Sequence, residues 1–295
     1  MAKQPRILVG QVAAVTGAAR GIGKATAQAF VREGMKVAIG DLDVELAEAA
    51  AAELGPNAAG FELDVTRRDS FEAFVDAVEE RFGPLDVLVN NAGIMPLGRF
   101  IDEDDATARR MIDINLHGVI HGMKIAIPRM MARNRGHVVN IASQAGKYGA
   151  PGGATYSATK HAVIGLTEAV RGELHIDGSA VELSYVMPFV VKTELGAGTQ
   201  GARGMKKLEP EQVADAIVDA LKRGVVDVWL PRSSRHTHRL GALLPRRVTE
   251  RLTRAMKADR VLMGADHQAR AAYELRAAHS EPGLESGDEQ RQLTS

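Results

Sequence analysis

The sequence predicts an α/β fold of the Rossmann type, a doubly wound sheet of seven parallel strands with helices on both faces. Short apolar segments alternate with longer segments of helical periodicity, which is the pattern of βαβ units. Several short segments are apolar at almost every position, as expected for strands that are covered on both faces. The 295 residues, 45% hydrophobic and 25% charged, are sufficient for one large core.

The predicted elements follow one another with little interruption. The strands are expected at residues 11–16, 35–40, 59–63, 85–90, 137–142, 181–186 and 225–230. The helices are expected near residues 22–33, 43–54, 69–82, 103–133, 154–176 and 210–223. The crossovers between parallel strands should be right-handed. These elements define one domain over residues 8–232.

Two segments depart from this alternation. Residues 194–207 are rich in glycine and too irregular to pack. Because they follow the carboxyl end of a strand, where open α/β sheets bind ligands, we predict a mobile lid rather than a plain surface loop. Residues 233–279 are expected to form a basic helical extension, and residues 280–295 a disordered tail.

The extension has two interpretations. Residues 232–260 contain nine Lys or Arg and only two acids, and an apolar stripe at helical spacing comprises Val248, Leu252, Ala255 and Met256. Such a helix can lie on a membrane surface or beside an anionic substrate. It can also dock on a neighbouring subunit with its charges in water. We favour the second interpretation, because most charged helix faces are simply solvated.

The composition excludes several classes of function. The formal net charge is zero, so no nucleic-acid partner is expected. The chain has no cysteine, which excludes disulfides and a thiolate nucleophile. No apolar run is long enough for a membrane span or a signal peptide, and we expect a cytoplasmic protein. No metal site is expected, because Gly118 stands between His117 and His121 where a zinc protease motif needs glutamate.

A glycine-rich turn joins the first predicted strand to the first predicted helix. It reads Thr16-Gly17-Ala18-Ala19-Arg20-Gly21-Ile22-Gly23. Glycines allow the backbone to approach a pyrophosphate, and the helix N-terminus offers free N–H groups to it. The turn therefore predicts a dinucleotide site. A P-loop is excluded because Lys24 is followed by Ala25 instead of Ser or Thr.

Other strand ends extend the predicted cofactor site. Asp41 follows the second strand, where a carboxylate can bind the ribose hydroxyls and repel a 2′-phosphate, which favours NAD over NADP. Arg20 favours NADP instead, because it could neutralise that phosphate; we expect Asp41 to prevail. Asp41 could also cap the following helix, although Asp43 could fill that role. The remaining candidates follow the third and fourth strands and are Asp64, Val65, Asn91, Ala92 and Gly93.

Tyr156 and Lys160 lie one turn apart at the start of a predicted helix, so their side chains share one face. A tyrosine titrates near pH 10 and is a poor base at neutral pH unless a nearby cation stabilises the phenolate. Ser143 follows the fifth predicted strand and can hold a substrate oxygen. Its Ala-Ser-Gln-Ala-Gly context is not the nucleophile elbow of a hydrolase. Asn115 lies within the predicted helix 103–133.

These motifs resemble the short-chain dehydrogenase/reductase family over about residues 8–232. The matching residues are Gly17, Gly21, Gly23, Asn90, Asn91, Ala92, Gly93, Asn115, Ser143, Tyr156 and Lys160, in the order and spacing of the family. The resemblance implies an NAD(P)-dependent oxidoreductase that interconverts a secondary alcohol and a ketone. It implies that Tyr156 is the general acid/base and that Ser143 orients the substrate. Lys160 would lower the pKa of the tyrosine and bind the nicotinamide ribose, and Asn115 would anchor a water that links Lys160 to solvent.

The sequence also departs from the family pattern. Pro188 and Thr193 match the cofactor-binding segment after the sixth strand, but Phe189 stands where the family usually has glycine. About 60 residues follow the seventh strand, so the family's usual tetramer cannot be assumed, and we expect a homodimer or a homotetramer. The predicted substrate pocket is apolar, which favours a lipophilic substrate; it comprises Met95, Gln144, Tyr148, Met187 and Phe189. The alternative function is a nucleotide-sensing or scaffold protein that has lost the chemistry.

Overall fold

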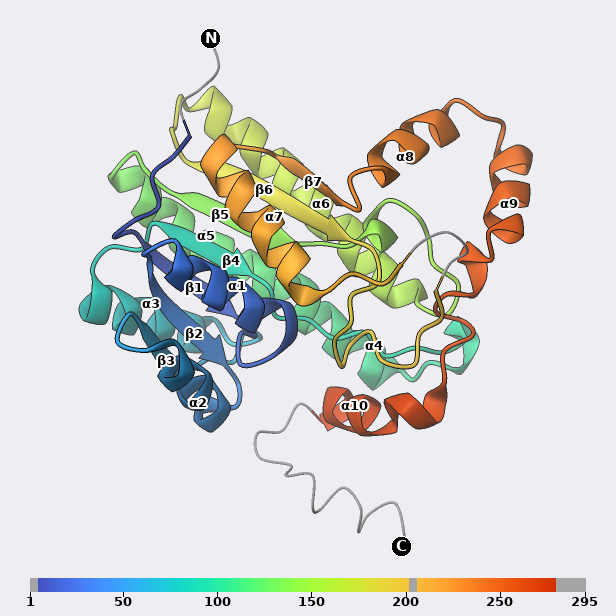
Figure 1. The fold of residues 1–295 in the computed structure, drawn as a ribbon, viewed down its shortest axis with the longest axis horizontal. Helices are drawn as coiled ribbons and strands as arrows, with labels where there is room; N and C mark the ends of the chain where they lie inside the picture. The colour runs from blue at the N-terminus through green and yellow to red at the C-terminus, as the bar shows by residue number, and fades with distance from the viewer. Residues whose placement is uncertain (1–4, 202–205, 280–295) are drawn as a thin grey trace, which may run out of the picture.

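The computed structural model describes residues 5–201 and 206–279 (Figure 1). Its centre is one sheet of seven parallel strands in the order β3-β2-β1-β4-β5-β6-β7. The strands are β1 (Val12–Thr16), β2 (Lys36–Asp41), β3 (Ala58–Glu62), β4 (Val87–Asn90), β5 (His137–Ile141), β6 (Glu182–Pro188) and β7 (Asp227–Leu230). The predicted fold class is confirmed. The order reverses between β1 and β4, and open α/β sheets bind ligands at such a point.

Helices cover both faces of the sheet. One face carries α1 (Gly21–Arg32), α2 (Val44–Leu54) and α7 (Pro210–Arg223), and the other carries α3 (Arg68–Phe82), α5 (Gly118–Ala132) and α6 (Ala154–Ile176). Successive residues of β1 alternate between the two cores: Ala13 and Val15 belong to the first, and Val12 and Ala14 to the second. All five residues of β1 are buried, which explains why an apolar run without alternation forms this strand.

The long helix that we predicted over residues 103–133 is interrupted. It consists of α4 (Asp105–Ile112), a π-helical turn (Asp113–His117) and α5. Asp104 starts α4 as its N-cap, because its carboxylate accepts a hydrogen bond from the Thr107 N–H at 2.9 Å. The π turn has no sequence signature that periodicity could detect, and such turns occur frequently at functional sites. It contains Asn115, which is completely buried.

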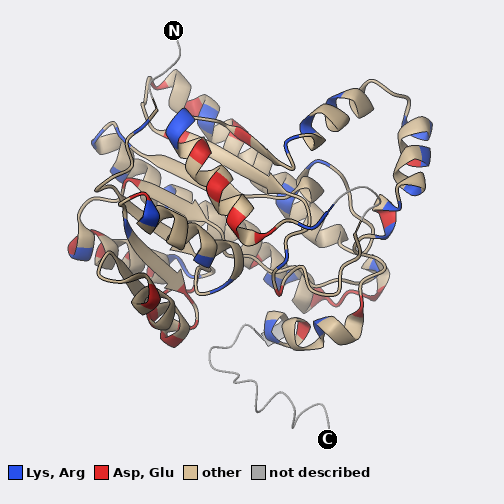
Figure 2. Cartoon of the chain, in the orientation of Figure 1, with Lys and Arg blue, Asp and Glu red and all other residues tan. Residues whose placement is uncertain are grey.

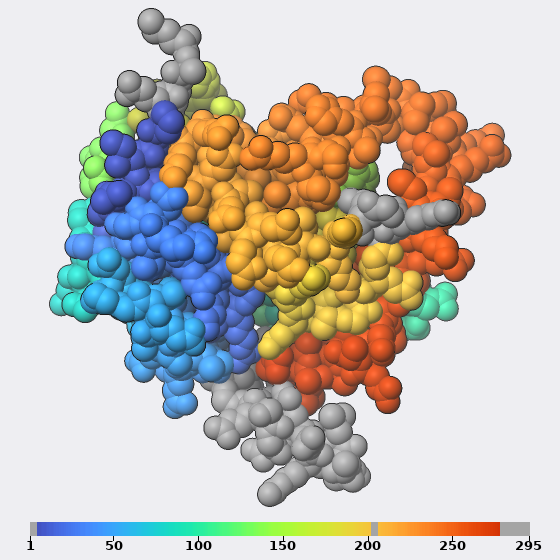
Figure 3. Space-filling model, viewed as in Figure 1, coloured from blue at the N-terminus to red at the C-terminus, as the bar shows by residue number. Residues whose placement is uncertain are grey.

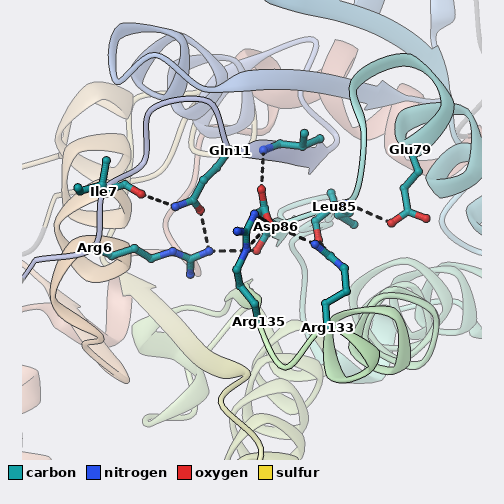
Figure 4. A network of polar contacts seen from close by, with 9 residues as sticks. Arg6, Ile7, Gln11, Glu79, Leu85, Asp86, Arg133 and Arg135 are labelled. Carbon is teal, nitrogen blue, oxygen red and sulfur yellow. Dashed lines mark hydrogen bonds and ion pairs between the residues drawn. The ribbon is translucent and has the colours of Figure 1, made fainter.

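A network of charged side chains closes the amino edge of the sheet (Figure 4). Asp86, which immediately precedes β4, is buried. Its carboxylate accepts hydrogen bonds from the Val12 N–H at 3.1 Å and from Arg135 Nη2 at 2.6 Å. Arg133 Nη1 contacts the same carboxylate at 3.3 Å. This cluster joins β1, β4 and the loop before β5 at the edge opposite the strand ends that we expect to bind ligands.

The chain after β7 forms three helices. α8 (Ser234–Ala242) and α9 (Arg246–Ala255) project from the body of the molecule as an arch rich in Arg (Figures 1 and 2). Figure 3 shows an opening between this α8–α9 arch and the rest of the molecule. The arch buries no apolar side chain. The continuous basic helix that we expected is therefore two short helices, separated by a turn at residues 243–245.

The third helix, α10 (His267–His279), returns to the body of the molecule beneath α4 (Figure 1). The predicted tail at residues 280–295 lies outside the described residues. Among the helices of the described chain, none is both long and apolar enough to span a membrane.

The glycine-rich segment 194–207 is more ordered than we predicted over its described part, residues 194–201 and 206–207. Gly196 and Thr199 are buried. The Gln200 N–H donates to the Val261 carbonyl at 3.0 Å, and the Asp266 N–H donates to the Gly198 carbonyl at 2.9 Å. The expectation that this segment is too irregular to pack is wrong for these residues, because the C-terminal extension supplies the partners that its backbone needs.

Candidate active site

The glycine-rich turn after β1 packs closely against the end of β4. Gly17 has a positive φ of 61°, and a Cβ atom there would lie 2.8 Å from Cα of Ala92. A Cβ atom on Gly23 would lie 2.5 Å from the Gly17 carbonyl oxygen. Asn91 holds the turn, because its Nδ2 donates to the carbonyls of Thr16 and Gly17, both at 2.9 Å. Larger side chains would therefore displace the turn or its neighbours at these two glycines.

Asp41, at the end of β2, is tied to the same turn. Its Oδ2 accepts a hydrogen bond from the Ala19 N–H at 3.0 Å. Burial raises the pKa of Asp41, while that hydrogen bond and the charge of Arg20 act in the opposite direction. The Arg20 guanidinium is partly exposed and lies 3.6 Å from the carboxylate of Asp43 and 3.9 Å from that of Glu194. Asp43, not Asp41, caps α2, by accepting from the Leu46 N–H.

The candidates after β3 face the same cavity as the glycine turn. Oδ1 of Asp64 accepts hydrogen bonds from the N–H of Thr66 at 2.9 Å and from its hydroxyl at 2.6 Å. Val65 is buried, and a Cβ atom on Gly118 would lie 3.0 Å from its side chain. The third strand therefore ends in a fixed turn with one carboxylate and one apolar side chain at the cavity.

Tyr156 lies near the start of α6 and is 7% exposed. Burial raises the pKa of Tyr156 to about 12, although a side-chain hydrogen bond with Ser143 acts to lower it. Ser143 follows β5, and its hydroxyl also accepts from the Ala145 N–H at 3.1 Å. In the protein alone, Tyr156 is therefore a neutral phenol at physiological pH.

Lys160 lies one turn further along α6 and is 4% exposed. Its Nζ donates to the Ile141 carbonyl at 2.8 Å and lies 5.7 Å from the centroid of the Tyr156 ring. Burial lowers the pKa of Lys160 to about 8, so the amine is mostly protonated at neutral pH. The pair shares one face of the helix, as its spacing predicts.

Asn115 binds the chain that leads from β4 into the site. Its Oδ1 accepts from the Ile94 N–H at 2.8 Å, and its Nδ2 donates to the Ile94 carbonyl at 2.9 Å and to the Thr159 hydroxyl at 3.2 Å. Gly93 is directly adjacent, since a Cβ atom there would lie 3.1 Å from Oδ1 of Asn115 and 3.6 Å from Nζ of Lys160. The asparagine thus fixes the backbone beside Lys160.

One cavity of about 1930 Å³ joins these groups. All the predicted site residues line it except Gly23, Asn115 and Met187. The predicted residues that line the cavity are Gly17, Arg20, Gly21, Ile22, Asp41, Asp64, Val65, Asn91, Ala92, Gly93, Met95, Ser143, Gln144, Tyr148, Tyr156, Lys160, Pro188, Phe189 and Thr193. Thr193 closes on the glycine turn, with its Cγ2 3.2 Å from the position of a Cβ atom on Gly21.

Two of the predicted pocket residues differ from expectation. Met187 is completely buried in the core under α5 and α6 and does not line the cavity, because alternation along β6 turns it away. Gln144 lines the cavity, but its Nε2 is occupied by the Leu230 carbonyl at 2.7 Å and the Ser234 hydroxyl at 2.8 Å. Its amide therefore joins β5 to the start of α8.

Sequence reasoning missed the contribution of the chain near α10. Val261 and Leu262 pack in one apolar cluster with Met95 and Tyr156, and Tyr273 lines the cavity. The spacing of Arg270, Tyr273 and Glu274 places them on one helical face, which could have identified a buried side of α10. The spacing does not indicate what that side covers.

Comparisons with known proteins give a consistent result. The family model described as short chain dehydrogenase matches residues 11–203. The chain is 40% identical to a sorbitol dehydrogenase of Cereibacter sphaeroides over 63% of this chain and 73% of that protein. It is 38% identical to a 3-alpha-(or 20-beta)-hydroxysteroid dehydrogenase of Mycobacterium tuberculosis over 72% of this chain and 82% of that protein.

A solved structure of a short chain dehydrogenase/reductase from Burkholderia phymatum, in complex with NAD, is also similar. Its TM-score is 0.74 at 28% identity, over 80% of this chain and 94% of that one. The family match ends at residue 203, so α8, α9 and α10 lie outside it.

Proposed function

Because this chain belongs to the short-chain dehydrogenase/reductase family, and is thus an NAD(P)-dependent oxidoreductase of alcohols and ketones, we propose that Tyr156 transfers the proton. The observation that supports this role is the burial of Tyr156 beside both Ser143 and Lys160 in the cavity that the glycine turn also lines. No other tyrosine of the sequence has a lysine four residues later.

The residues of the cavity fit a dinucleotide. The contacts that a Cβ atom would make at Gly17 and Gly23 describe a turn in which only glycine lets the backbone approach a phosphate. Gly21 begins α1, so the free N–H groups of that helix face the same turn. Asp41, Asp64 and Asn91 would hold the adenosine half, and Lys160 and Thr193 the nicotinamide half. When bound, the nicotinamide accepts or gives the hydride at the carbinol carbon.

The protein's own groups would manage the proton. For ketone reduction, the neutral phenol of Tyr156 can donate its proton to the carbonyl oxygen while the hydroxyl of Ser143 holds that oxygen. For alcohol oxidation, the phenol must first lose its proton. The ammonium of Lys160 stabilises the phenolate, and Asn115 would hold a water that passes the proton toward solvent. The low dielectric of the buried site strengthens each of these interactions.

We further propose a preference for NAD. The Asp41 carboxylate lies at the end of β2, where it would accept hydrogen bonds from the ribose hydroxyls and repel a 2′-phosphate. Arg20, the one cation in the glycine turn, already lies near the carboxylates of Asp43 and Glu194. Its charge is therefore less available for a phosphate.

The substrate that the cavity fits best is lipophilic. Around Tyr156 the wall is apolar, with Met95, Phe189, Leu195 and Leu262 in one cluster. Apolar lining with few polar groups is common in ligand sites, so this proposal depends on the cluster's position beside Tyr156. The polyol and steroid activities named for similar proteins span both hydrophilic and lipophilic alcohols.

The test is a panel of alcohols and ketones, with the absorbance of NADH and NADPH followed in parallel. Tyr156→Phe should lower kcat at least 1000-fold while NADH still binds, because only the transferable proton is lost. The matched control is Tyr148→Phe, which alters a second cavity tyrosine and should keep most of the turnover. Persistent turnover in Tyr156→Phe would contradict the proposed role. A wild-type protein that binds NADH but converts no member of the panel would favour a nucleotide-sensing protein instead.

A further inference from the structure

The helix α10 is attached to the active-site wall through Arg270. This side chain is completely buried. Its Nη1 donates to the carbonyls of Leu195 and Ala197, both at 2.8 Å, and its Nη2 donates to the Met95 carbonyl at 2.7 Å. Its Nε contacts the carboxylate of Glu274 at 2.8 Å. One guanidinium thus joins α10 to the segment after β4 and to the segment after β6, which both line the cavity.

Tyr273, on the same side of α10, reaches the cavity itself. Its hydroxyl oxygen accepts a hydrogen bond from the Met95 N–H at 2.6 Å. The Arg270 guanidinium stacks against its ring, 4.9 Å from the centroid. The position and orientation of the phenol are therefore fixed from two sides. Within residues 5–201 and 206–279, this is the one hydrogen bond of the Tyr273 hydroxyl, and in it the hydroxyl acts as acceptor.

Tyr273 is also linked to Tyr156 through Met95, which donates its N–H to Tyr273 and packs in one apolar cluster with Tyr156. Burial raises the pKa of Tyr273, and a negative charge on Tyr156 raises it further, although the Met95 hydrogen bond and the charge of Arg270 oppose the shift. Tyr273 therefore keeps its proton at neutral pH. A neutral phenol that accepts from the backbone still has its own hydrogen to donate.

We infer that Tyr273 donates a hydrogen bond to a second oxygen of the substrate, beside the carbinol oxygen held by Ser143 and Tyr156. The inference rests on the proposed role of Tyr156. It names a polar subsite in an otherwise apolar wall, and it assigns that subsite to a helix outside the family match. The substrate class is then an alcohol or ketone with a second hydroxyl or carbonyl group near the reacting carbon.

A buried donor selects for such substrates, because a substrate without the second oxygen leaves the hydroxyl hydrogen of Tyr273 without an acceptor. The test compares three alcohols that differ only in that group: cyclohexanol, trans-1,2-cyclohexanediol and 1,3-cyclohexanediol. Wild-type enzyme should oxidise at least one diol with a kcat/KM about tenfold above that for cyclohexanol. Tyr273→Phe keeps the ring and should abolish this preference, because kcat/KM should fall about tenfold more for the diol than for cyclohexanol.

The ratio of two kcat/KM values measured on one preparation does not depend on the fraction of folded enzyme, so a less stable variant still gives a result. Tyr185→Phe is the matched control, because Tyr185 lies outside the cavity and bonds Glu168 instead. It should keep the wild-type ratio.

Two outcomes would overturn the inference. An equal loss with all three alcohols in Tyr273→Phe would mean that Tyr273 only holds the Met95 backbone. A wild-type enzyme that prefers cyclohexanol to both diols would exclude a polar subsite. Neither outcome affects the proposed role of Tyr156, whose failure would instead appear as turnover in Tyr156→Phe.

Discussion

At the scale of single residues, burial determines the properties of the site more than sequence spacing does. The spacing of Tyr156 and Lys160 predicts a shared helical face, and we expected the lysine to lower the pKa of the tyrosine. In the structure, burial dominates and raises the pKa of Tyr156 to about 12. The phenol therefore carries its proton at neutral pH, and formation of the phenolate depends on added positive charge such as that of an oxidised nicotinamide ring.

The lowered pKa of Lys160 predicts a pH dependence of stability. Its folded pKa of about 8 lies below its ordinary value of 10.5. Between these values the unfolded chain holds a proton that the folded protein does not, so the free energy of unfolding rises with pH. From pH 8 to pH 10 the gain should be about 2 kcal/mol. Denaturant unfolding of Lys160→Met should lack this rise; an identical rise in both proteins would contradict it.

Asp41 carries the proposed choice of cofactor. Asp41→Ala removes the carboxylate that would repel a 2′-phosphate, and it leaves Arg20 nearby. We expect the ratio of kcat/KM for NADP to that for NAD to rise at least tenfold, mainly through a lower KM for NADP. Asp215→Ala is the control, because it removes an exposed carboxylate that does not line the cavity. An Asp41→Ala variant with the wild-type ratio would contradict the proposed role of Asp41 in the preference for NAD.

At the scale of elements, the edge opposite the site depends on one carboxylate. Asp86 is buried and joins β1 to the arginines before β5 (Figure 4). Asp86→Asn would remove the charge from a buried acceptor of hydrogen bonds while the arginines keep access to water, and we expect a loss of about 2 kcal/mol in the free energy of unfolding. Asp76→Asn, which breaks the largely exposed pair with Arg129, should cost less than about 0.5 kcal/mol.

The two substitutions are compared by urea unfolding monitored by circular dichroism. KM for NADH should stay at the wild-type value in both variants, since neither residue lies near the cavity. Equal midpoints of unfolding for Asp86→Asn and Asp76→Asn would refute the assignment of Asp86 as the main polar contact at this edge.

A second buried charged side chain, Arg270, attaches α10 to the rest of the molecule. Arg270→Ala leaves three carbonyls and the Glu274 carboxylate without their donor, so we expect a loss of about 3 kcal/mol and a lower kcat/KM. Arg247→Ala, in the exposed α9, should change neither quantity measurably, because its side chain is exposed and does not line the cavity. Thermal unfolding and steady-state kinetics distinguish the two. A variant Arg270→Ala as stable as wild type would show that α10 does not depend on this residue.

At the scale of the whole molecule, the sheet was predictable because a short stretch of sequence determines each of its strands. Each strand of the sheet is a short apolar run, and several candidates lie at or just after a strand end, as Gly17, Asp41 and Ser143 do. Parallel topology then brings these strand ends to one edge. The π turn around Asn115 and the seat of α10 could not be predicted, because both depend on contacts between segments far apart in the chain. Arg270 meets Met95 across 175 positions.

The α8–α9 arch has a consequence for how this enzyme can change. The arch lines the cavity, yet it contributes no apolar side chain to any buried cluster. Apart from Ser234, which is buried against Gln144, core packing therefore constrains the sequence of the arch less than that of the helices on the sheet. Mutations there can alter which molecules enter while the proton-handling groups stay untouched. The arch is therefore the region to vary in a directed search for new substrates.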